Sequence, residues 1–338
     1  MRLSISIVLS ILASLLNGCG GGGGGDSSSS TTTTSCTQSS PCVFSSGVTM
    51  NYLRYMYFDE ATNLLYVVDG DSNLCNAGTY GRIRKFNGIT GAYQSSYGGA
   101  NDILCPTGVV VLNGQVFATG KIPSGRSGLI NMSVLPYASI ASADQLGYGL
   151  AVSNNRLFMS YDNLVAGSVV VYDKNSPPSW KNSETVNPNL INGPVGMAYD
   201  PAGYIYVTHR DSGIGQTIGV SKINTVINAG TSQYASSDFA NSNLFDKPSG
   251  IAVRSSPREV YVVNTGSTES QAGILKISTD GNGNSTGVST FLTASNLSSK
   301  LCSPVGIAIG GNNLFISNGK CPTTGNSAYA STILKIAL

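Results

Sequence analysis

The feature that most constrains the fold is a recurring unit of three short apolar runs separated by turns, which is clearest over residues 247–278. There the segments 250–253, 259–263 and 273–277 are rich in β-branched and aromatic residues, which predicts three strands. Similar units begin at Tyr55, Gly108, Gly149, Gly196 and Gly306. Their starts lie 41 to 56 residues apart, a spacing typical of four-stranded propeller blades rather than helical repeats. Six units therefore predict six blades.

The unit also resembles a known repeat. The first strand has the pattern Pro-x-Gly, apolar, Ala, apolar. A turn, a second strand with Tyr-Val, a loop and a third strand with lysine follow. This order resembles the NHL repeat. A first-strand glycine occurs in five units, with Tyr55 as the exception, and the lysine occurs in four: Lys85, Lys222, Lys276 and Lys335. The resemblance runs from about residue 42 to the C-terminus and implies an all-β, six-bladed β-propeller. It says little about activity, because one fold hosts many functions.

The repeated positions have a physical interpretation. Innermost strands of a propeller crowd around the axis, and glycine there lets neighbouring backbones approach. Each second strand carries one aromatic residue at the same position, which gives Tyr66, Phe117, Phe158, Tyr206, Tyr261 and Phe315. We expect these six side chains to form the core between adjacent sheets, each stabilising it by roughly 2 kcal/mol or more.

The N-terminal residues predict export. Residues 1–18 combine Arg2 with an apolar run too short to span a bilayer, as in a cleaved signal peptide. The following Leu-Asn-Gly-Cys19 resembles a bacterial lipobox, which implies lipidation of Cys19; an ordinary secretory signal with an incidental cysteine is the alternative. Gly20 favours the outer membrane by the same analogy. Residues 19–40, rich in glycine, serine and threonine, read as a disordered tether, and 41–338 as the propeller.

The last repeat lacks a fourth strand. The chain ends on the third strand of unit six, over residues 333–337, while residues 42–49 precede unit one and have no blade of their own. We therefore expect this N-terminal stretch to supply the missing outer strand and close the ring.

Cysteine usage agrees with export. Without Cys19 six cysteines remain, an even number. Because loops after second strands and loops that lead into the next blade share one face, we predict two pairs, Cys75 with Cys105 and Cys302 with Cys321. Elimination then pairs Cys36 with Cys42. None has the close spacing of zinc ligands, so we expect no metal at these sites.

Polar residues follow the second strands on that same face. They are Asp69, Asp71, Asp162, His209, Asp211, Asn264 and Asn318. One hypothesis is a ring of carboxylates and amides that binds a cation or polar ligand at the channel mouth. The alternative, which we favour, is that these side chains cap the turns that follow them. His209 is the sole histidine and cannot build a histidine-rich zinc site; acid–base chemistry with Asp211 or Arg210 stays open.

The function predicted from the sequence is binding. A net charge of +2 with few charged residues argues against a nucleic-acid partner. We expect a monomeric, lipid-anchored binding or interaction module of the bacterial cell envelope, facing the periplasm or the medium, with a protein or glycan partner and no cofactor. The alternative is a calcium-dependent lactonase or lyase, since enzymes on similar scaffolds place a glutamate, an asparagine and an aspartate on the axis. Glu60 and the other glutamates instead fall in turns, outer segments or a second-strand start.

Overall fold

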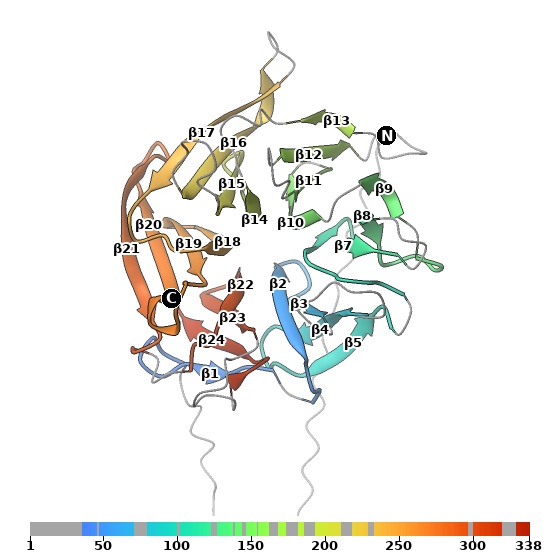
Figure 1. The fold of residues 1–338 in the computed structure, drawn as a ribbon, viewed down its shortest axis with the longest axis horizontal. Coiled ribbons are helices and arrows are strands. Elements are labelled where there is room, and N and C mark those ends of the chain that lie inside the picture. Colours follow the sequence, from blue (N-terminus) through green and yellow to red (C-terminus); the bar gives the residue numbers. More distant parts are fainter. Residues whose placement is uncertain are drawn as a thin grey trace, which may run out of the picture. The chain divides into compact units, whose positions relative to one another are not determined.

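The fold is an all-β propeller of six four-stranded sheets arranged in a ring (Figure 1). The computed structural model describes residues 36–45, 47–70, 80–99, 102–122, 127–137, 139–143, 147–153, 155–161, 168–173, 182–185, 193–210, 218–228, 233–296, 300–319 and 329–338. No helix among them is long and apolar enough to cross a bilayer. The predicted fold class and blade number are confirmed.

Each blade runs from an innermost strand to an outer one, with antiparallel neighbours. Blade 1 contains β2 (Tyr52–Asp59), β3 (Leu64–Gly70), β4 (Arg82–Asn87) and β5 (Tyr93–Tyr97). Blade 2 contains β6 (Val109–Leu112), β7 (Gln115–Lys121), β8 (Ser127–Asn131) and β9 (Ser139–Ala143). Blade 3 contains β10 (Gly147–Ser153), β11 (Arg156–Tyr161), β12 (Ser168–Asp173) and β13 (Asn182–Thr185).

The second half of the ring repeats this order. Blade 4 contains β14 (Pro194–Asp200), β15 (Tyr204–His209), β16 (Gly219–Asn228) and β17 (Gln233–Asn241). Blade 5 contains β18 (Pro248–Ser255), β19 (Arg258–Asn264), β20 (Gly273–Thr279) and β21 (Ser285–Thr293), with a 3-10 turn, η2 (Glu269–Gln271), before β20. Blade 6 contains β22 (Pro304–Gly310), β23 (Asn313–Asn318), β24 (Ile333–Ala337) and, as its outer strand, β1 (Cys42–Val43).

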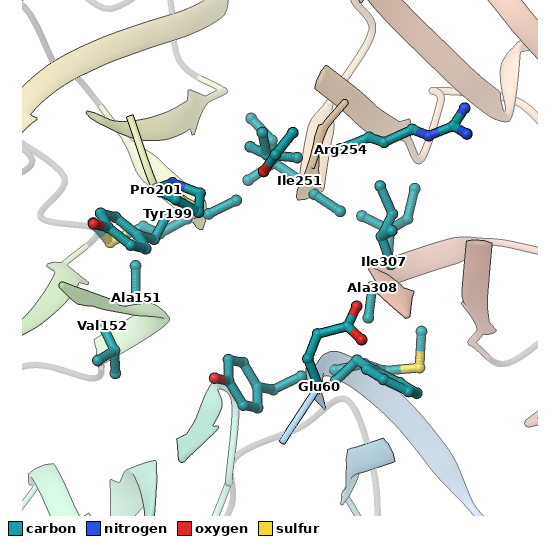
Figure 2. A pocket seen from close by; sticks show the side chains of 18 of the residues that line it. Glu60, Ala151, Val152, Tyr199, Pro201, Ile251, Arg254, Ile307 and Ala308 are labelled. Atoms are coloured by element: carbon teal, nitrogen blue, oxygen red, sulfur yellow. The ribbon is translucent and has the colours of Figure 1, made fainter. Parts of the chain in front are cut away.

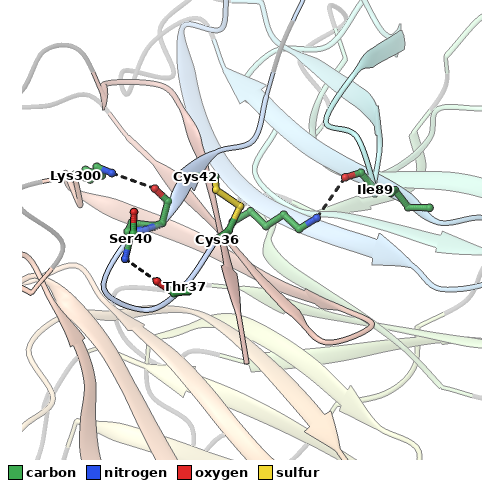
Figure 3. The surroundings of a disulfide bond; sticks show 8 residues. Cys36, Thr37, Ser40, Cys42, Ile89 and Lys300 are labelled. Atoms are coloured by element: carbon green, nitrogen blue, oxygen red, sulfur yellow. Dashed lines mark hydrogen bonds between the residues drawn. A yellow bond between two sulfur atoms is a disulfide. The ribbon is translucent and has the colours of Figure 1, made fainter. Parts of the chain in front are cut away.

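The N-terminal stretch closes the ring as predicted. Strand β1 pairs antiparallel with β24, Cys42 opposite Lys335 and Val43 opposite Leu334, so the strand itself is shorter than the predicted segment 42–49. The next residue, Phe44, donates its backbone N–H to Ile333 O at 2.7 Å. A disulfide joins Cys36 to Cys42 just before this pairing, as predicted (Figure 3). The N-terminal part of the chain is thus fastened to the C-terminal strand.

The core lies between blades. The described residues form six buried apolar clusters, one at each junction of neighbouring sheets. All six aromatic side chains predicted from the second strands are buried in them, at exposures of 0 to 5%. Phe315 of blade 6, for example, stacks on Phe58 of blade 1 with ring centroids 5.5 Å apart. The predicted aromatic core is confirmed.

The first-strand glycines have the predicted steric role. A Cβ on Gly196 would collide with the backbone oxygen of Ser249 on the next blade, and one on Gly306 with the backbone oxygen of Arg54. Equivalent collisions occur at Gly108, Gly149 and Gly250. Neighbouring innermost strands therefore pack backbone to backbone around the axis.

Hydroxyl side chains on the second strands bridge these contacts. Thr208 accepts the N–H of Gly196 at 2.8 Å and donates to Ser249 O of blade 5 at 2.6 Å, while its own exposure is 0%. The same bridge is made in three more blades, by Thr119, Ser160 and Ser317. In blade 5 the equivalent residue is Val263, and Ser249 donates to Val305 O instead. We call these four hydroxyls the blade bridges.

Two ends of the channel follow from the antiparallel order. At one, the turn end, first strands turn into second strands and third strands into fourth. At the other, the loop end, each chain segment enters a blade and second strands connect to third strands. The predicted ligand face lies at the loop end.

Candidate functional site

A cavity of about 560 Å³ lies inside the ring at the turn end of the channel. Its walls come from the innermost strands of blades 1, 3, 4, 5 and 6 and from the turns that follow them. Figure 2 shows side chains of these blades, including Ala151, Tyr199, Ile251 and Ile307, surrounding an open centre. The cavity is therefore at the opposite end from the predicted ligand face.

Most of the lining residues are apolar, but polar atoms form about half of the surface that faces the cavity. Leu150, Met197, Ile251 and Ile307 each come from a different blade and line the cavity. No described residue of blade 2 lines the cavity, and Tyr57 of blade 1, which does line it, packs against the apolar clusters on both sides of blade 2. Burial, with the nearby carboxylates of Asp59 and Glu60, raises the pKa of Tyr57 to about 12, so its phenol stays protonated. The cavity suits a ligand with an apolar body.

Polar groups gather at the turns. The exposed Glu60 follows β2, and its Oε1 accepts the N–H of Gly311 on blade 6 at 2.9 Å. Arg254 bonds the same turn of blade 6 from the other side: its Nη2 donates to Asn312 Oδ1 at 2.7 Å, and in Figure 2 its guanidinium points away from the open centre. Its Nη1 lies 3.6 Å from Glu259 Oε2. The guanidinium of Arg254 is thus bound to protein partners, whereas the Glu60 carboxylate accepts one hydrogen bond from the described residues and can accept another from a ligand.

Glu259 anchors this polar group. Burial alone would raise its pKa, but hydrogen bonds from Tyr261 and Lys276 and the charges of Lys276 and Arg254 outweigh that effect and lower the pKa. The carboxylate therefore stays ionised and holds Arg254 in place. Glu60 was not predicted as a site residue, because a single glutamate in the turn after a first strand does not belong to any recognisable motif.

At the loop end, three of the predicted ligand residues have structural partners. Asp69 accepts the N–H groups of Asn51 and Tyr52 and pairs with Arg84 Nε at 2.9 Å. Asn264 accepts the N–H of Asp246 and donates to Leu244 O and Gln271 O. Asn318 accepts the N–H of Cys302 and donates to Lys300 O, Tyr329 O and Thr332 Oγ1. Each ties the segment that enters its blade to the end of the second strand, and Asn264 and Asn318 also donate to the loop that follows their strand.

His209 occupies the same position in blade 4 and is also buried, at 3% exposure. Neither ring nitrogen has a hydrogen-bond partner among the described residues. Burial lowers the pKa of its imidazole, and the charge of Asp238 opposes this only in part. The neutral imidazole is therefore the native form.

Several predicted residues lie outside the described part of the chain. They are Cys19, Asp71, Cys75, Asp162, Asp211 and Cys321. Cys105 and Cys302 are each disulfide-bonded, and their predicted pairing with Cys75 and Cys321 stays a prediction. The proposed ligand ring at the loop end also stays a prediction. Within the described residues, no group of three His, Cys, Asp or Glu side chains is placed to hold a metal ion.

One side chain crosses the channel at the loop end. Tyr55 replaces the first-strand glycine in blade 1, and its phenol meets the guanidinium of Arg210, which follows β15 in blade 4. Blades 1 and 4 are opposite each other in the ring, so this contact spans the axis (Figure 1). Burial raises the pKa of Tyr55 to about 12, although the positive charges of Arg210 and Arg54 lower it in part.

Comparison with known proteins identifies the fold. A gluconolactonase of Xanthomonas campestris superposes with a TM-score of 0.55 at 11% identity, covering 90% of this chain and 91% of that one. A PQQ-bound aldose sugar dehydrogenase of Streptomyces coelicolor gives 0.56 at 14% identity, covering 87% and 96%. A chain of the nidogen/laminin complex gives 0.54 at 12% identity, covering 81% and 93%. No protein-family model and no curated protein matches the sequence. Likenesses at such low identity show the fold alone.

Proposed function

We propose that this chain is an exported, lipid-anchored, NHL-like binding module of the bacterial cell envelope, and that its ligand enters the cavity at the turn end. The observation that carries the proposal is the cavity itself. Its volume of about 560 Å³ falls in the range of small-ligand pockets, and apolar side chains line it together with polar groups, as in many such pockets.

The lining indicates which chemistry fits. Apolar side chains from five blades would bury an apolar or aromatic group, and Glu60 at the edge would accept a hydrogen bond from an N–H or O–H of the ligand. Of the two partner classes expected from the sequence, we favour a protein that inserts an aromatic or aliphatic side chain between the apolar side chains of the wall.

The test uses N-phenyl-1-naphthylamine, a fluorescent apolar amine with one N–H donor. We expect saturable 1:1 binding to the purified full chain, seen as an increase in fluorescence. Replacing Val152, which lines the cavity, by tryptophan should fill the space and weaken binding about tenfold or more. Glu60→Gln should weaken it less, by roughly threefold, because an amide oxygen is a poorer acceptor than a carboxylate.

Leu244→Trp is the matched control, since Leu244 is 38% exposed and lies in the loop-end connection between blades 4 and 5. It adds the same side chain outside the cavity and should leave binding unchanged. Fluorescence that does not saturate, or that Val152→Trp leaves intact, would refute the cavity as the binding site.

Anchoring is tested separately. Mass analysis of the mature protein from a bacterial host should find Cys19 as the N-terminal residue carrying lipid, and Cys19→Ser should move the chain from the membrane fraction to the soluble one. A Cys19→Ser chain that still fractionates with membranes, or a wild-type chain without lipid, would contradict the anchor.

The alternative function is a calcium-dependent lactonase. The likeness in fold to the Xanthomonas campestris gluconolactonase supports this alternative. The cavity edge contains one glutamate, Glu60, and one asparagine, Asn312, but no aspartate among the described lining residues. Stoichiometric calcium in the purified protein, together with lactone hydrolysis that Glu60→Gln abolishes, would favour the enzyme over the binding module.

A further inference from the structure

Six described arginines are at least partly buried, and they fall into two groups. Four that are partly or fully buried each face a carboxylate: Arg84 with Asp69, Arg156 with Asp173, Arg254 with Glu259 and Arg258 with Asp200. Two more, Arg54 and Arg210, are half-buried at the loop end of the channel, and no described carboxylate pairs with either.

Arg54 has no hydrogen-bond partner for its guanidinium among the described residues. Its buried Nε has no hydrogen-bond partner there, and its guanidinium makes a cation–π contact with Tyr52, 5.2 Å from the ring centroid. The backbone of Arg54 is fixed, because its carbonyl oxygen accepts the Ser317 hydroxyl at 2.7 Å. Arg210 Nε donates to Pro248 O at 3.2 Å, which positions that guanidinium without neutralising it.

Both cations converge on Tyr55. The phenol of Tyr55 meets the guanidinium of Arg210 and lies within the electrostatic reach of Arg54, and Tyr148 of blade 3 is near as well. These groups come from blades 1, 3 and 4, so they surround the channel axis rather than one blade. Two like charges near a buried phenol, with no described counter-charge, are costly unless an anion joins them.

We propose that Arg54, Arg210 and Tyr55 form a site for an oxyanion group, a carboxylate or a phosphate of a ligand, at the loop end of the channel. Two guanidinium groups supply charge and fork-shaped donors, and the protonated phenol supplies an O–H donor. The site is at the opposite end from the cavity and does not depend on the function proposed above.

The test measures thermal unfolding of the full chain with inorganic phosphate and, in parallel, with succinate at equal ionic strength. We expect at least one of them to raise Tm in a saturable manner, with a dissociation constant in the millimolar range or tighter. Succinate alone would identify a carboxylate site, and phosphate alone a phosphate site. Arg54→Gln and Arg210→Gln should each weaken the effect about tenfold, and Tyr55→Phe by less.

Arg82→Gln is the matched control, because Arg82 is an exposed arginine at the start of β4, at the same end of blade 1. It removes the same charge and should leave the effect intact. Without ligand, Arg54→Gln should not lower Tm, since it removes an unpaired charge. No stabilisation by either anion, an effect that survives both glutamine variants, or equal loss in Arg82→Gln would each overturn the proposal.

Discussion

A single hydroxyl can hold two blades together. In four blades a buried Ser or Thr receives the N–H of its own first-strand glycine and donates to a carbonyl of the next blade. Because glycine brings the two backbones close, the hydroxyl can reach both. In these four blades, the blade bridges therefore supply hydrogen-bond partners to buried backbone groups of two neighbouring innermost strands.

Thr208→Val tests a blade bridge. The substitution keeps the shape of the side chain but leaves the Gly196 N–H and the Ser249 carbonyl without their shared partner in a buried position. We expect the free energy of unfolding to fall by about 2–3 kcal/mol, measured by urea denaturation. Thr208→Ser keeps the hydroxyl and should cost clearly less. Equal losses in the two variants would show that packing, not hydrogen bonding, sets the cost.

His209 predicts a pH dependence of stability. Its pKa in the folded chain is lowered from 6.5 by burial, so the unfolded chain binds the proton more tightly. The free energy of unfolding should therefore be at its full value above pH 6.5 and decrease as the pH falls below it, by at most about 1.4 kcal/mol per pH unit.

His209→Asn is the informative variant, because Asn264 and Asn318 occupy the same position in blades 5 and 6. As His209 is the only histidine, the variant should flatten the stability profile between about pH 5 and 6.5, where carboxylates contribute little. Urea denaturation at several pH values measures this. An unchanged slope in the variant would assign the pH dependence to other groups.

Residue identities predicted the core well and the sites poorly. The aromatic position of the second strands and the first-strand glycines repeat in most units, so their packing role could be predicted from the sequence. Glu60, Arg54 and Tyr55, in contrast, have no residue of the same type at the equivalent position of another blade. A site built from residues that do not repeat depends on which blades face each other across the axis. The sequence does not show which blades are opposite each other; the closed ring does.

At the scale of elements, the short strand β1 carries the closure. Phe44, which follows it, is 6% exposed, its ring lies 4.8 Å from that of Phe315, and the Lys335 ammonium lies 5.1 Å from its centroid. The disulfide between Cys36 and Cys42 restricts the segment on the other side of β1. Packing and a covalent link thus compensate for a strand of two residues.

Phe44→Ala should therefore weaken the closure. We expect a loss of about 3 kcal/mol in the free energy of unfolding, because a buried ring is removed from between blades 6 and 1. Phe44→Leu preserves most of the apolar volume and should cost about 1 kcal/mol. Urea denaturation provides both values, and native-state proteolysis should cut the alanine variant earlier near residue 44. A loss below 1 kcal/mol for Phe44→Ala would show that β1 is not needed to keep the ring closed.

The strands themselves were predicted within a few residues, and the missing outer strand was predicted by counting. The length of this outer strand was not predicted correctly, because the prediction covered residues 42–49 and only Cys42 and Val43 pair with β24. A run of Ser, Gly and Val after Phe44 has no alternation that would separate strand from loop. The cavity could not be predicted either, because its walls are apolar residues that the repeat already explains as core.

At the scale of the whole molecule, the N-terminal segment meets the propeller at the same end as the cavity. Cys36 O accepts the N–H of Ala337, and Leu338 donates its N–H to the backbone of Asn312, a residue that lines the cavity. The segment that leads toward Cys19 therefore joins the propeller at the turn end, where the cavity lies. If Cys19 carries lipid, as proposed, residues 20–35 set how far the cavity can stand from the membrane.

Shortening that segment tests this arrangement. A Gly/Ser-rich linker of the length of residues 20–35 has a span of roughly 20–24 Å, and deletion of residues 22–31 would reduce this to roughly 13 Å. In lipidated protein on vesicles, the deletion should reduce access of an antibody fragment directed at the exposed Glu60 turn. Binding of N-phenyl-1-naphthylamine, a small molecule, should not change. The same deletion in a Cys19→Ser background, free in solution, should affect neither. If antibody access on vesicles were equal for both lengths, the cavity would not be facing the membrane.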